Sequence, residues 1–255
     1  MKERKFFNSN YLEYSETINS FVSHFDTSGK LVSDQERNSL KSFRLNDEEI
    51  NVKSFKIPNI VNQITYRFFR KSKAQRSFEY ANVLLEKAIG TPTPIAYYEF
   101  TSPFLFKRSF YVSKQQNYDL TYRELTTDLS YPEHEKILRA FTRFTFAMHE
   151  NSILFLDHSP GNTLIEKDGD HYKFYLVDLN RMRFGNMDFE TRIKNFERLT
   201  VHKSMVEIMS DEYAKCLGAD KKAVFSLMWK YTENFQEKYH KRMRVKKKLK
   251  FWKRL

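Results

Sequence analysis

The stretch Asp157-His158-Ser159-Pro160-Gly161-Asn162 decides which fold this chain is expected to have. It places one carboxylate and one amide five residues apart, and a second carboxylate, Asp178, follows at the end of an apolar run. A phosphoryl-transfer site of the kinase type needs an Asp to accept the proton of the attacking hydroxyl. It also needs an Asn and an Asp to bind Mg²⁺ against the nucleotide phosphates. The three side chains are therefore candidates for such a site.

A β-hairpin is predicted between Asn162 and Asp178. Residues 163–165 are partly β-branched, Asp168-Gly169 is a turn signal, and residues 172–177 are aromatic and aliphatic. The alternative interpretation is an ordinary loop and hairpin with surface acids, because the D-x-x-x-x-N pattern alone is common. The hairpin and its terminal carboxylate favour the phosphoryl-transfer site.

The composition predicts a folded chain. Its 255 residues suit one large domain or two small lobes, and 40% hydrophobic and 16% aromatic residues argue against global disorder. The single cysteine, Cys216, has no disulfide or metal-ligand companion, which indicates a reducing, cytoplasmic setting. The charged N-terminus lacks a following apolar run, so no signal peptide is expected. No apolar run reaches the roughly 18 residues that indicate a membrane span.

The net charge of +12 is concentrated at one end of the chain. Residues 239–255 contain nine Lys or Arg and no Asp or Glu. Apolar residues are interleaved with these cations, namely Met243, Val245, Leu249, Phe251 and Trp252. This basic tail is expected to bind an anionic membrane surface, because aromatic rings beside lysines suit the headgroup level. A solvated helix end and a nucleic-acid contact are the alternatives, with nucleic acid the least favoured.

Residues 67–73 form a second basic and aromatic segment, Arg67-Phe68-Phe69-Arg70-Lys71-Ser72-Lys73. It is expected either to bind an anionic acceptor or to dock on a membrane. The alternative is a solvated helix edge with Phe68 and Phe69 buried.

The first half of the chain is predicted to be β-rich with one main helix. Strands are expected at residues 21–25, 31–32, 39–45, 50–55, 95–100 and 106–112, with a polar loop at 33–38. Helices are expected at residues 60–69 and from an N-cap at Ser72 to about residue 88. The breaker Gly90-Thr91-Pro92-Thr93-Pro94 ends the main helix, and residues 113–118 are polar enough to link two lobes.

The second half is predicted to be mainly helical with one hairpin. A helix is expected at residues 133–151, and more helices follow Gly185, with N-caps at Ser210 and Asp220 and a stop at Gly218. The expected fold is therefore α+β, with the two lobes of a protein-kinase-like fold. The predicted boundaries are a β-rich N-lobe at 1–115, a helical C-lobe at 116–238 and the basic tail at 239–255.

A kinase also needs a cation on the nucleotide phosphates and a carboxylate to orient that cation. Lys53 lies inside the last strand before the main helix and is preferred over Lys56, which is close to the break at Pro58. Glu79 on the main helix is the expected carboxylate, with Glu86 as the second choice.

No Gly-x-Gly-x-x-Gly loop is present, and Gly29 is the one glycine in the first 80 residues. Any loop that covers the nucleotide is therefore expected at residues 33–38, with Arg37 or backbone amides near the phosphates.

These residues together resemble the lipopolysaccharide core kinases, which phosphorylate heptose or 3-deoxy-D-manno-octulosonic acid (Kdo) of the inner core. The resemblance covers roughly residues 29–185 and rests on the following segments: Val52-Lys53-Ser54-Phe55, residues 72–79, residues 90–94, residues 157–162 and Val177-Asp178-Leu179-Asn180-Arg181. It implies that Asp157 is the catalytic base and that Asn162 and Asp178 bind Mg²⁺. It also implies that Lys53 contacts the phosphates of ATP and that Glu79 is its partner.

The chain departs from the protein-kinase pattern at several positions. Phe155 and Leu156 stand where protein kinases have the His and Arg before the catalytic Asp, and Ser159 replaces their Lys. Leu179-Asn180 follows the metal Asp in place of Phe-Gly. These changes argue against a protein kinase but remove no phosphate-binding or metal-binding group.

The resemblance implies an ATP- and Mg²⁺-dependent sugar kinase that acts on Kdo, or on heptose, attached to lipid A. Its expected location is the inner face of the cytoplasmic membrane, as a peripheral protein. The alternatives are a non-catalytic membrane- or nucleic-acid-binding module on a kinase-like scaffold, or a kinase of another small molecule or protein.

Overall fold

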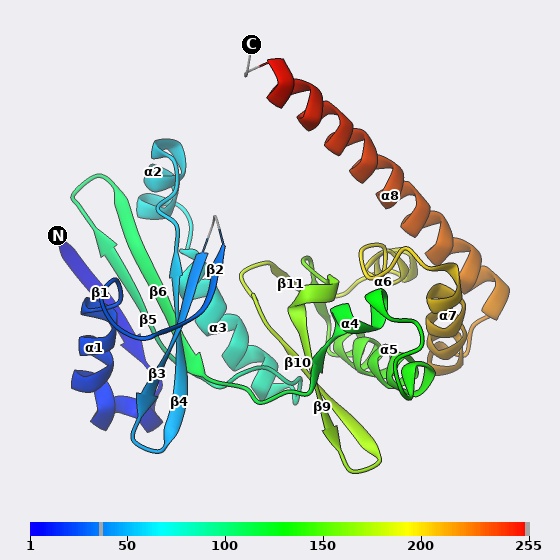
Figure 1. Ribbon diagram of the computed structural model, residues 1–255, viewed down its shortest axis with the longest axis horizontal. Helices are drawn as coiled ribbons and strands as arrows, with labels where there is room; N and C mark the ends of the chain where they lie inside the picture. The colour runs from blue at the N-terminus through cyan, green and yellow to red at the C-terminus, as the bar shows by residue number, and fades with distance from the viewer. Residues whose placement is uncertain (36–37, 253–255) are drawn as a thin grey trace. The chain divides into compact units, whose positions relative to one another are not determined.

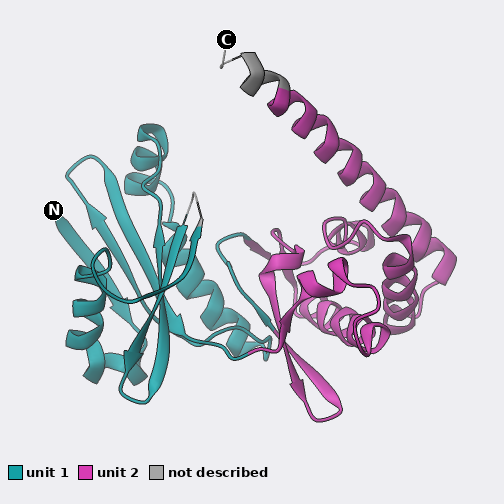
Figure 2. Ribbon diagram, in the orientation of Figure 1, with its two compact units in different colours: residues 1–117, 175–181 teal, residues 118–174, 182–255 magenta. Residues whose placement is uncertain are grey.

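The computed structural model describes the backbone of residues 1–35 and 38–252 and the side chains of residues 1–34 and 38–247. The chain forms two compact units (Figure 2). Unit 1 contains residues 1–117 and 175–181, and unit 2 contains residues 118–174 and 182–255. The segment that carries Asp178 therefore belongs to unit 1, although most of the hairpin before it belongs to unit 2.

Unit 1 is built on a six-stranded antiparallel sheet with the order β1-β5-β6-β4-β3-β2 (Figure 1). The strands are β1 (Lys2–Phe7), β2 (Lys30–Gln35), β3 (Asn38–Leu45), β4 (Glu48–Phe55), β5 (Pro94–Thr101) and β6 (Phe106–Lys114). The strands expected at residues 39–45, 50–55, 95–100 and 106–112 are confirmed. The first six residues of β5 are all buried, so this strand is covered on both faces, whereas β3, β4 and β6 are buried only in part.

The helices of unit 1 are η1 (Ser9–Tyr14), α1 (Ser15–Ser23), α2 (Ile60–Phe68) and α3 (Lys73–Glu86). The Ser72 side chain accepts a hydrogen bond from the Gln75 backbone N at 3.1 Å, which confirms the predicted N-cap of α3. The strand expected at residues 21–25 is wrong, because residues 15–23 form α1. Ile18 and Val22, one helical turn apart, are both buried in the core beside the sheet.

The polar loop expected at residues 33–38 is largely wrong. Residues 33–35 continue β2 and Asn38 begins β3, since the two strands pair along these positions. Arg37, the expected phosphate contact, lies outside the described residues.

Unit 2 contains most of the remaining elements. They are β7 (Leu120–Thr121), α4 (Tyr122–Thr127), α5 (His134–Glu150), β8 (Ile153–Phe155), η2 (Pro160–Asn162), β9 (Thr163–Asp168), β10 (His171–Leu176), β11 (Met182–Phe184), α6 (Phe189–Lys194), α7 (Lys203–Leu217) and α8 (Lys221–Trp252). The predicted hairpin is confirmed as β9 and β10, and Gly169 at its turn has a φ of 58°. The predicted helix at residues 133–151 is confirmed as α5.

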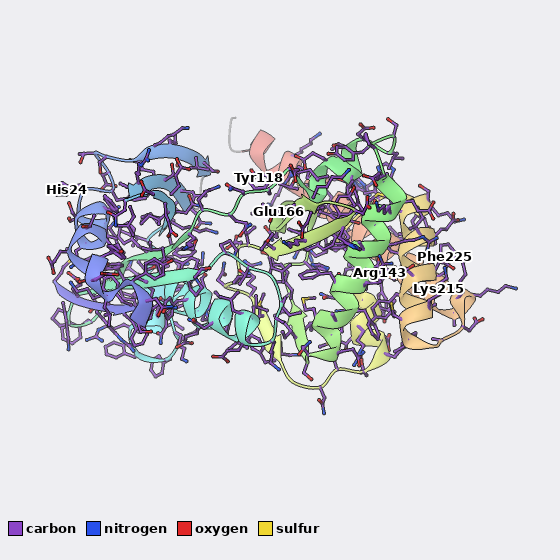
Figure 3. All side chains as sticks on the ribbon, turned by 90° about the horizontal axis from the view of Figure 1, so that it is seen from below. His24, Tyr118, Arg143, Glu166, Lys215 and Phe225 are labelled. Atoms are coloured by element: carbon purple, nitrogen blue, oxygen red, sulfur yellow. The ribbon has the colours of Figure 1, made fainter. Side chains whose placement is uncertain are left out.

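Helix α5 packs against α7 through an apolar core and a rim of ion pairs. Ile137, Leu138 and Phe141 are buried. At the rim, Arg139 of α5 lies 2.7 Å from Asp211 of α7, and Arg143 of α5 pairs with Glu212 of α7; Arg143 is labelled in Figure 3. These contacts tie α7, which follows the loop of Asp157 by some forty residues, to the helix that precedes this loop.

The helix ends in unit 2 follow the predicted caps with one exception. Gly218 ends α7 in a left-handed conformation, and Asp220 accepts a hydrogen bond from Ala223 N at 2.8 Å at the start of α8. Ser210 is not an N-cap, because it lies buried inside α7 and donates its hydroxyl to the Glu207 carbonyl. Helix α8 continues into the basic tail, and none of the described helices is both long enough and apolar enough to cross a membrane.

Candidate active site

Lys53 and Asp178 form an ion pair inside unit 1. Lys53 lies in the middle of β4, opposite Leu40 of β3 and Tyr111 of β6, and its Nζ donates to Asp178 Oδ1 at 2.8 Å. Lys56 lies beyond the end of β4 and is exposed. The structure thus brings the lysine that was preferred from the sequence to the expected metal carboxylate.

The backbone of Asp178 is held in a conformation that non-glycine residues seldom adopt. Its φ is 59°, in the left-handed region. The Asn180 Nδ2 donates to the same Asp178 Oδ1 at 2.6 Å. Outliers of this kind gather at functional sites, where surrounding contacts keep them in place. Together with the ion pair to Lys53, this conformation makes Asp178 a candidate functional residue.

The environment of Asp178 keeps its carboxylate ionised. Burial alone would raise the pKa of Asp178, but the charge of Lys53, the hydrogen bonds from Lys53 and Asn180 and the charge of Lys73 together hold the pKa below its usual value. A carboxylate that stays charged is ready to bind a cation.

The segment that carries Asp178 is anchored at both ends within unit 1. Before Asp178, the Leu176 N donates to the Gly90 carbonyl and the Thr91 hydroxyl donates to the Leu176 carbonyl, both at 2.8 Å. After it, the buried Arg76 donates from Nη1 to the Asn180 carbonyl at 2.7 Å. The Gly90-Thr91 pair and Arg76 therefore have a physical role, which is to fix the backbone around Asp178.

Among the described residues, Glu79 forms no hydrogen bond or ion pair with Lys53. Its carboxylate accepts from Lys71 Nζ at 2.8 and 2.9 Å and from Gln75 Nε2 at 2.9 Å. Both partners are near in sequence, so the cost in chain entropy of these contacts is small. The expected pair of Lys53 and Glu79 stays a prediction for the nucleotide-bound protein. Glu86, the second choice, is the exposed last residue of α3.

The loop that carries Asp157 forms a second set of contacts, inside unit 2. Asp157 follows β8, and its Oδ1 accepts from Arg198 Nη1 at 2.6 Å. The Asn162 Nδ2 donates to the Asp157 backbone carbonyl at 2.8 Å. Because the amide is planar, its Oδ1 is turned away from that carbonyl. The loop thus closes on itself and orients the two side chains that the sequence singled out.

His158 supports the same loop from inside the core of unit 2. Its ring stacks on Phe141 with centroids 5.3 Å apart, and its Nε2 lies 3.3 Å from the Thr145 hydroxyl. Burial, with the nearby charges of His149 and Arg198, lowers the pKa of His158 to about 3. A neutral imidazole beneath Asp157 is therefore a packing and orienting group.

A buried polar chain reaches the loop from α7. The Asn195 Nδ2 donates to the Phe155 carbonyl at 2.9 Å, and Asn195 Oδ1 lies 3.1 Å from His149 Nε2. The other ring nitrogen of His149 lies 2.9 Å from the Tyr213 hydroxyl. Burial lowers the pKa of His149 to about 4. The neutral ring then donates to Asn195 and accepts from Tyr213, so every member of the chain has a partner.

Sequence reasoning missed Arg198, Asn195 and His149. Arg198 and Asn195 lie about forty positions from the loop groups that they bond, and His149 acts only through Asn195. No spacing rule links such positions in a single sequence. A positive charge and two polar residues in mainly helical segments carried no signal that distinguished them from surface residues.

The donor set suits Mg²⁺ better than a metal held by a full protein cage. The described residues contain no cluster of three or more His, Cys, Asp or Glu side chains. Mg²⁺ binds one or two protein oxygens and completes its shell with phosphate and water. Oxygen donors of this kind are the ionised carboxylate of Asp178 in unit 1 and, separately, the side-chain amide of Asn162 in unit 2.

Comparison with known proteins bears on the fold. No family model matches the chain, and no curated protein matches it. A solved structure described as WaaP in complex with acyl carrier protein matches it with a TM-score of 0.62. The match covers 91% of this chain and 98% of that chain at 15% identity. The chain has a two-lobed, protein-kinase-like fold. The α+β fold expected from the sequence is thereby confirmed, with unit 1 as the β-rich lobe and unit 2 as the helical lobe.

Proposed function

We propose that this protein is an ATP- and Mg²⁺-dependent kinase that phosphorylates a hydroxyl of an inner-core lipopolysaccharide sugar, Kdo or heptose. The observation that carries the proposal is the bonded pair of Lys53 and the left-handed Asp178 on a protein-kinase-like fold. These two groups have opposite charges and complementary tasks, since one binds phosphate and the other binds the metal ion that accompanies it.

Each residue of the proposed site has a separate task. Lys53 contacts the phosphates of ATP, and Asp178 and Asn162 are the protein ligands of Mg²⁺, which neutralises charge on the phosphates. The Asp157 carboxylate accepts the proton of the sugar hydroxyl as that oxygen attacks the γ-phosphorus. Arg198 holds the Asp157 carboxylate in place through its bond to Oδ1. Most of the rate acceleration in such a site comes from positioning and charge neutralisation.

The acceptor class is supported by the resemblance of residues 29–185 to lipopolysaccharide core kinases and by the similarity in fold to WaaP. The basic tail supports an anionic, lipid-linked acceptor, since residues 239–255 have nine Lys or Arg and no acid. A protein of this kind acts at the inner face of the cytoplasmic membrane as a peripheral enzyme. The tail brings the enzyme to the surface where such an acceptor lies.

The alternative is a non-catalytic membrane- or nucleic-acid-binding module on the same scaffold. The observation that favours it is that Lys53 bonds to Asp178 and Glu79 bonds to Lys71, so the expected phosphate lysine lacks its expected partner. The alternative predicts no stabilisation by ATP and Mg²⁺, whereas a kinase is stabilised by mass action when the nucleotide binds.

The experiment is phosphate transfer from ATP to Kdo-lipid A and to a heptose-containing acceptor, followed by mass spectrometry. One added phosphate on one of these sugars is expected with the native chain and not with Asp157→Ala. The matched control is Asp168→Ala, which removes an exposed carboxylate at the hairpin turn and leaves transfer unchanged. Transfer that persists in Asp157→Ala contradicts the assigned base, and the lack of transfer to both sugars contradicts the acceptor class.

A further inference from the structure

Helix α2 (Ile60–Phe68) exposes apolar side chains that a folded protein normally buries. None of its nine residues is buried. Its large apolar residues Ile60, Val61, Ile64 and Phe68 are all exposed, and the next residue, Phe69, is 83% exposed. Single exposed apolar residues are ordinary, but a contiguous group of five marks a surface that something else covers.

The apolar surface continues onto the turn between β5 and β6. Arg67 Nε donates to the Ser102 and Pro103 carbonyls at 3.1 and 3.3 Å, which ties the end of α2 to this turn. The next turn residue, Phe104, is 75% exposed. In Figure 1, α2 and the β5–β6 turn lie at the same end of the sheet of unit 1.

Helix α2 is held in place rather than loosely attached. The Tyr66 ring lies 5.7 Å from that of Phe106 on β6, and the Asn59 side chain caps the helix through Asn62 N at 3.0 Å. The apolar surface is therefore preformed, and its exposure is not the fraying of a helix that lacks contacts.

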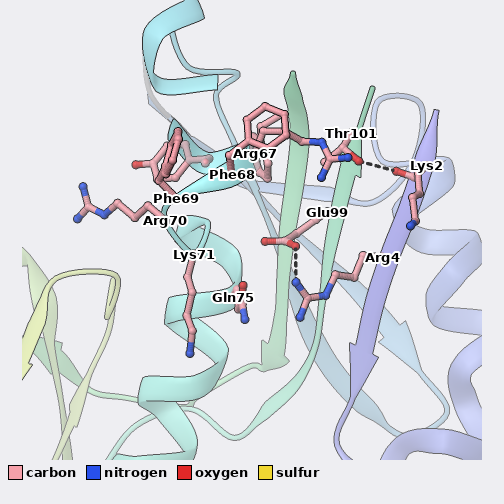
Figure 4. Close-up of a pocket in the computed structure, with 12 residues that line it drawn as sticks. Lys2, Arg4, Arg67, Phe68, Phe69, Arg70, Lys71, Gln75, Glu99 and Thr101 are labelled. Carbon is pink, nitrogen blue, oxygen red and sulfur yellow. Dashed lines mark hydrogen bonds and ion pairs between the residues drawn. The ribbon is translucent and has the colours of Figure 1, made fainter. Parts of the chain in front are cut away.

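A basic groove of about 550 Å³ lies beside this apolar surface (Figure 4). Its basic lining residues are Lys2, Arg4, Arg67, Arg70 and Lys71. Its single acidic lining residue, Glu99, is buried and lies 3.8 Å from Arg4. Lys71 bonds to Glu79 nearby. Five cations against the two carboxylates of Glu99 and Glu79 leave the hollow with a net positive charge that suits an anion.

We propose that α2, Phe69, Phe104 and the basic groove form a membrane-docking surface that binds anionic phospholipid. The apolar side chains stand on a helix and a turn, and two of them, Phe68 and Phe69, line the groove together with the cations. At the boundary between hydrocarbon and headgroups, exposed apolar side chains insert toward the acyl chains, while neighbouring Lys and Arg side chains can contact the phosphates. The mixture of exposed apolar and basic side chains on this surface therefore suits that boundary.

The same surface is poorly suited to nucleic acid. Single-stranded nucleic acid is bound by stacking on aromatic rings along a basic path, and the aliphatic Ile60, Val61 and Ile64 have no such use. The docking surface is separate from the basic tail on α8, which belongs to unit 2. The proposal of a docking surface does not depend on whether the chain transfers phosphate.

The test is co-sedimentation of the full chain with phosphatidylcholine vesicles that contain or lack phosphatidylglycerol. Phe69→Ser with Phe104→Ser is expected to lower partition into the anionic vesicles about tenfold, since partly burying two aromatic rings stabilises the bound state. The control pair is Leu12→Ser with Leu129→Ser, which removes two exposed apolar residues elsewhere and is expected to leave partition unchanged.

The second arm reverses charge in the groove. Lys2→Glu with Arg70→Glu is expected to lower partition about twenty-five-fold or more, because each basic residue near an anionic surface contributes a factor of about five. The control pair is Lys30→Glu with Lys87→Glu, both exposed in unit 1. All variants are surface changes, so unaltered thermal unfolding checks that each one folds.

If partition into the anionic vesicles is unchanged in both the groove variants and the apolar variants, the proposal is overturned. The basic tail is then left as the membrane contact. The proposal is also overturned if the variants no longer bind an acidic soluble protein but still bind the vesicles. The surface would then be a binding site for a protein partner. Stabilisation of the chain by ATP is measured in parallel, because it tests the proposed kinase activity separately. Failure of the docking surface is thereby distinguished from failure of the proposed kinase activity.

Discussion

The ammonium of Lys53 lies 2.8 Å from a carboxylate oxygen of Asp178, which is 125 residues further along the chain. The pair joins the middle of β4 to the segment after β10, both within unit 1. Each group compensates the partial burial of the other. In the proposed kinase, this ion pair keeps the phosphate-binding and metal-binding side chains next to each other before the nucleotide binds.

Replacement of Lys53 is expected to damage both activity and stability. Lys53→Met removes the proposed phosphate-binding cation, and kcat is expected to fall at least about a hundredfold. It also leaves the half-buried Asp178 without its cation, which is expected to cost about 1–2 kcal/mol of unfolding free energy. ATP turnover and urea unfolding measure the two effects. Lys56→Met, an exposed lysine just past β4, is the control, and equal effects of the two variants contradict the assignment of Lys53.

Loss of Arg198 is expected to lower the rate of phosphate transfer without weakening ATP binding. Arg198 holds Asp157 through a 2.6 Å contact, so Arg198→Ala leaves the proposed base poorly oriented and kcat is expected to fall about tenfold or more. Steady-state kinetics separates kcat from the KM for ATP. Arg198→Lys keeps the charge and is expected to recover part of the rate, whereas Arg183→Ala, at an exposed position on β11, serves as the control. An unchanged kcat in Arg198→Ala rules out this positioning role.

Glu79 is expected to matter only when the nucleotide is bound. If it then orients Lys53, Glu79→Gln lowers kcat/KM for ATP by about ten- to a hundredfold. Lys71→Ala removes the present partner of Glu79 and is expected to leave the rate unchanged or to raise it. Both are measured by initial rates at limiting ATP. Equal losses in the two variants indicate instead that the local pair of Lys71 and Glu79 is itself required.

The buried histidines predict a loss of stability below neutral pH. Burial lowers the pKa of His149 to about 4 and that of His158 to about 3, against an ordinary value of 6.5. Below pH 6.5 the unfolded chain binds protons that the folded chain does not, so the unfolding free energy falls as the pH drops from 6.5 towards 4. Each histidine contributes a slope of up to about 1.4 kcal/mol per pH unit.

Urea unfolding at pH 7, 6 and 5 measures this dependence. His149→Gln and His158→Gln are each expected to flatten the slope, because glutamine does not titrate in this range. His171→Gln is the control, since His171 is exposed on the hairpin. A slope that is the same in all four proteins shows that the two buried imidazoles do not set the pH dependence.

The predictions from the sequence that are confirmed concern local structure. The N-cap at Ser72, the turn at Gly169 and the helix stop at Gly218 depend on backbone geometry within a few residues. The strand expected at residues 21–25 was wrong because a short apolar run fits either period. The burial of Ile18 and Val22 on one helical face, which decides for α1, appears only once the sheet is present.

The sequence by itself determined the α+β plan, the hairpin between Asn162 and Asp178 and the choice of residues that carry the proposed chemistry. Tertiary structure alone decided which groups meet. It bonded Lys53 to Asp178 rather than to Glu79, brought Arg198 to Asp157 and Arg76 to Asn180, and left α2 exposed beside a basic groove. The physical reason is that caps and turns are selected by nearby residues. Ion pairs and surfaces depend on distances across the fold, which the order of residues in the chain does not contain.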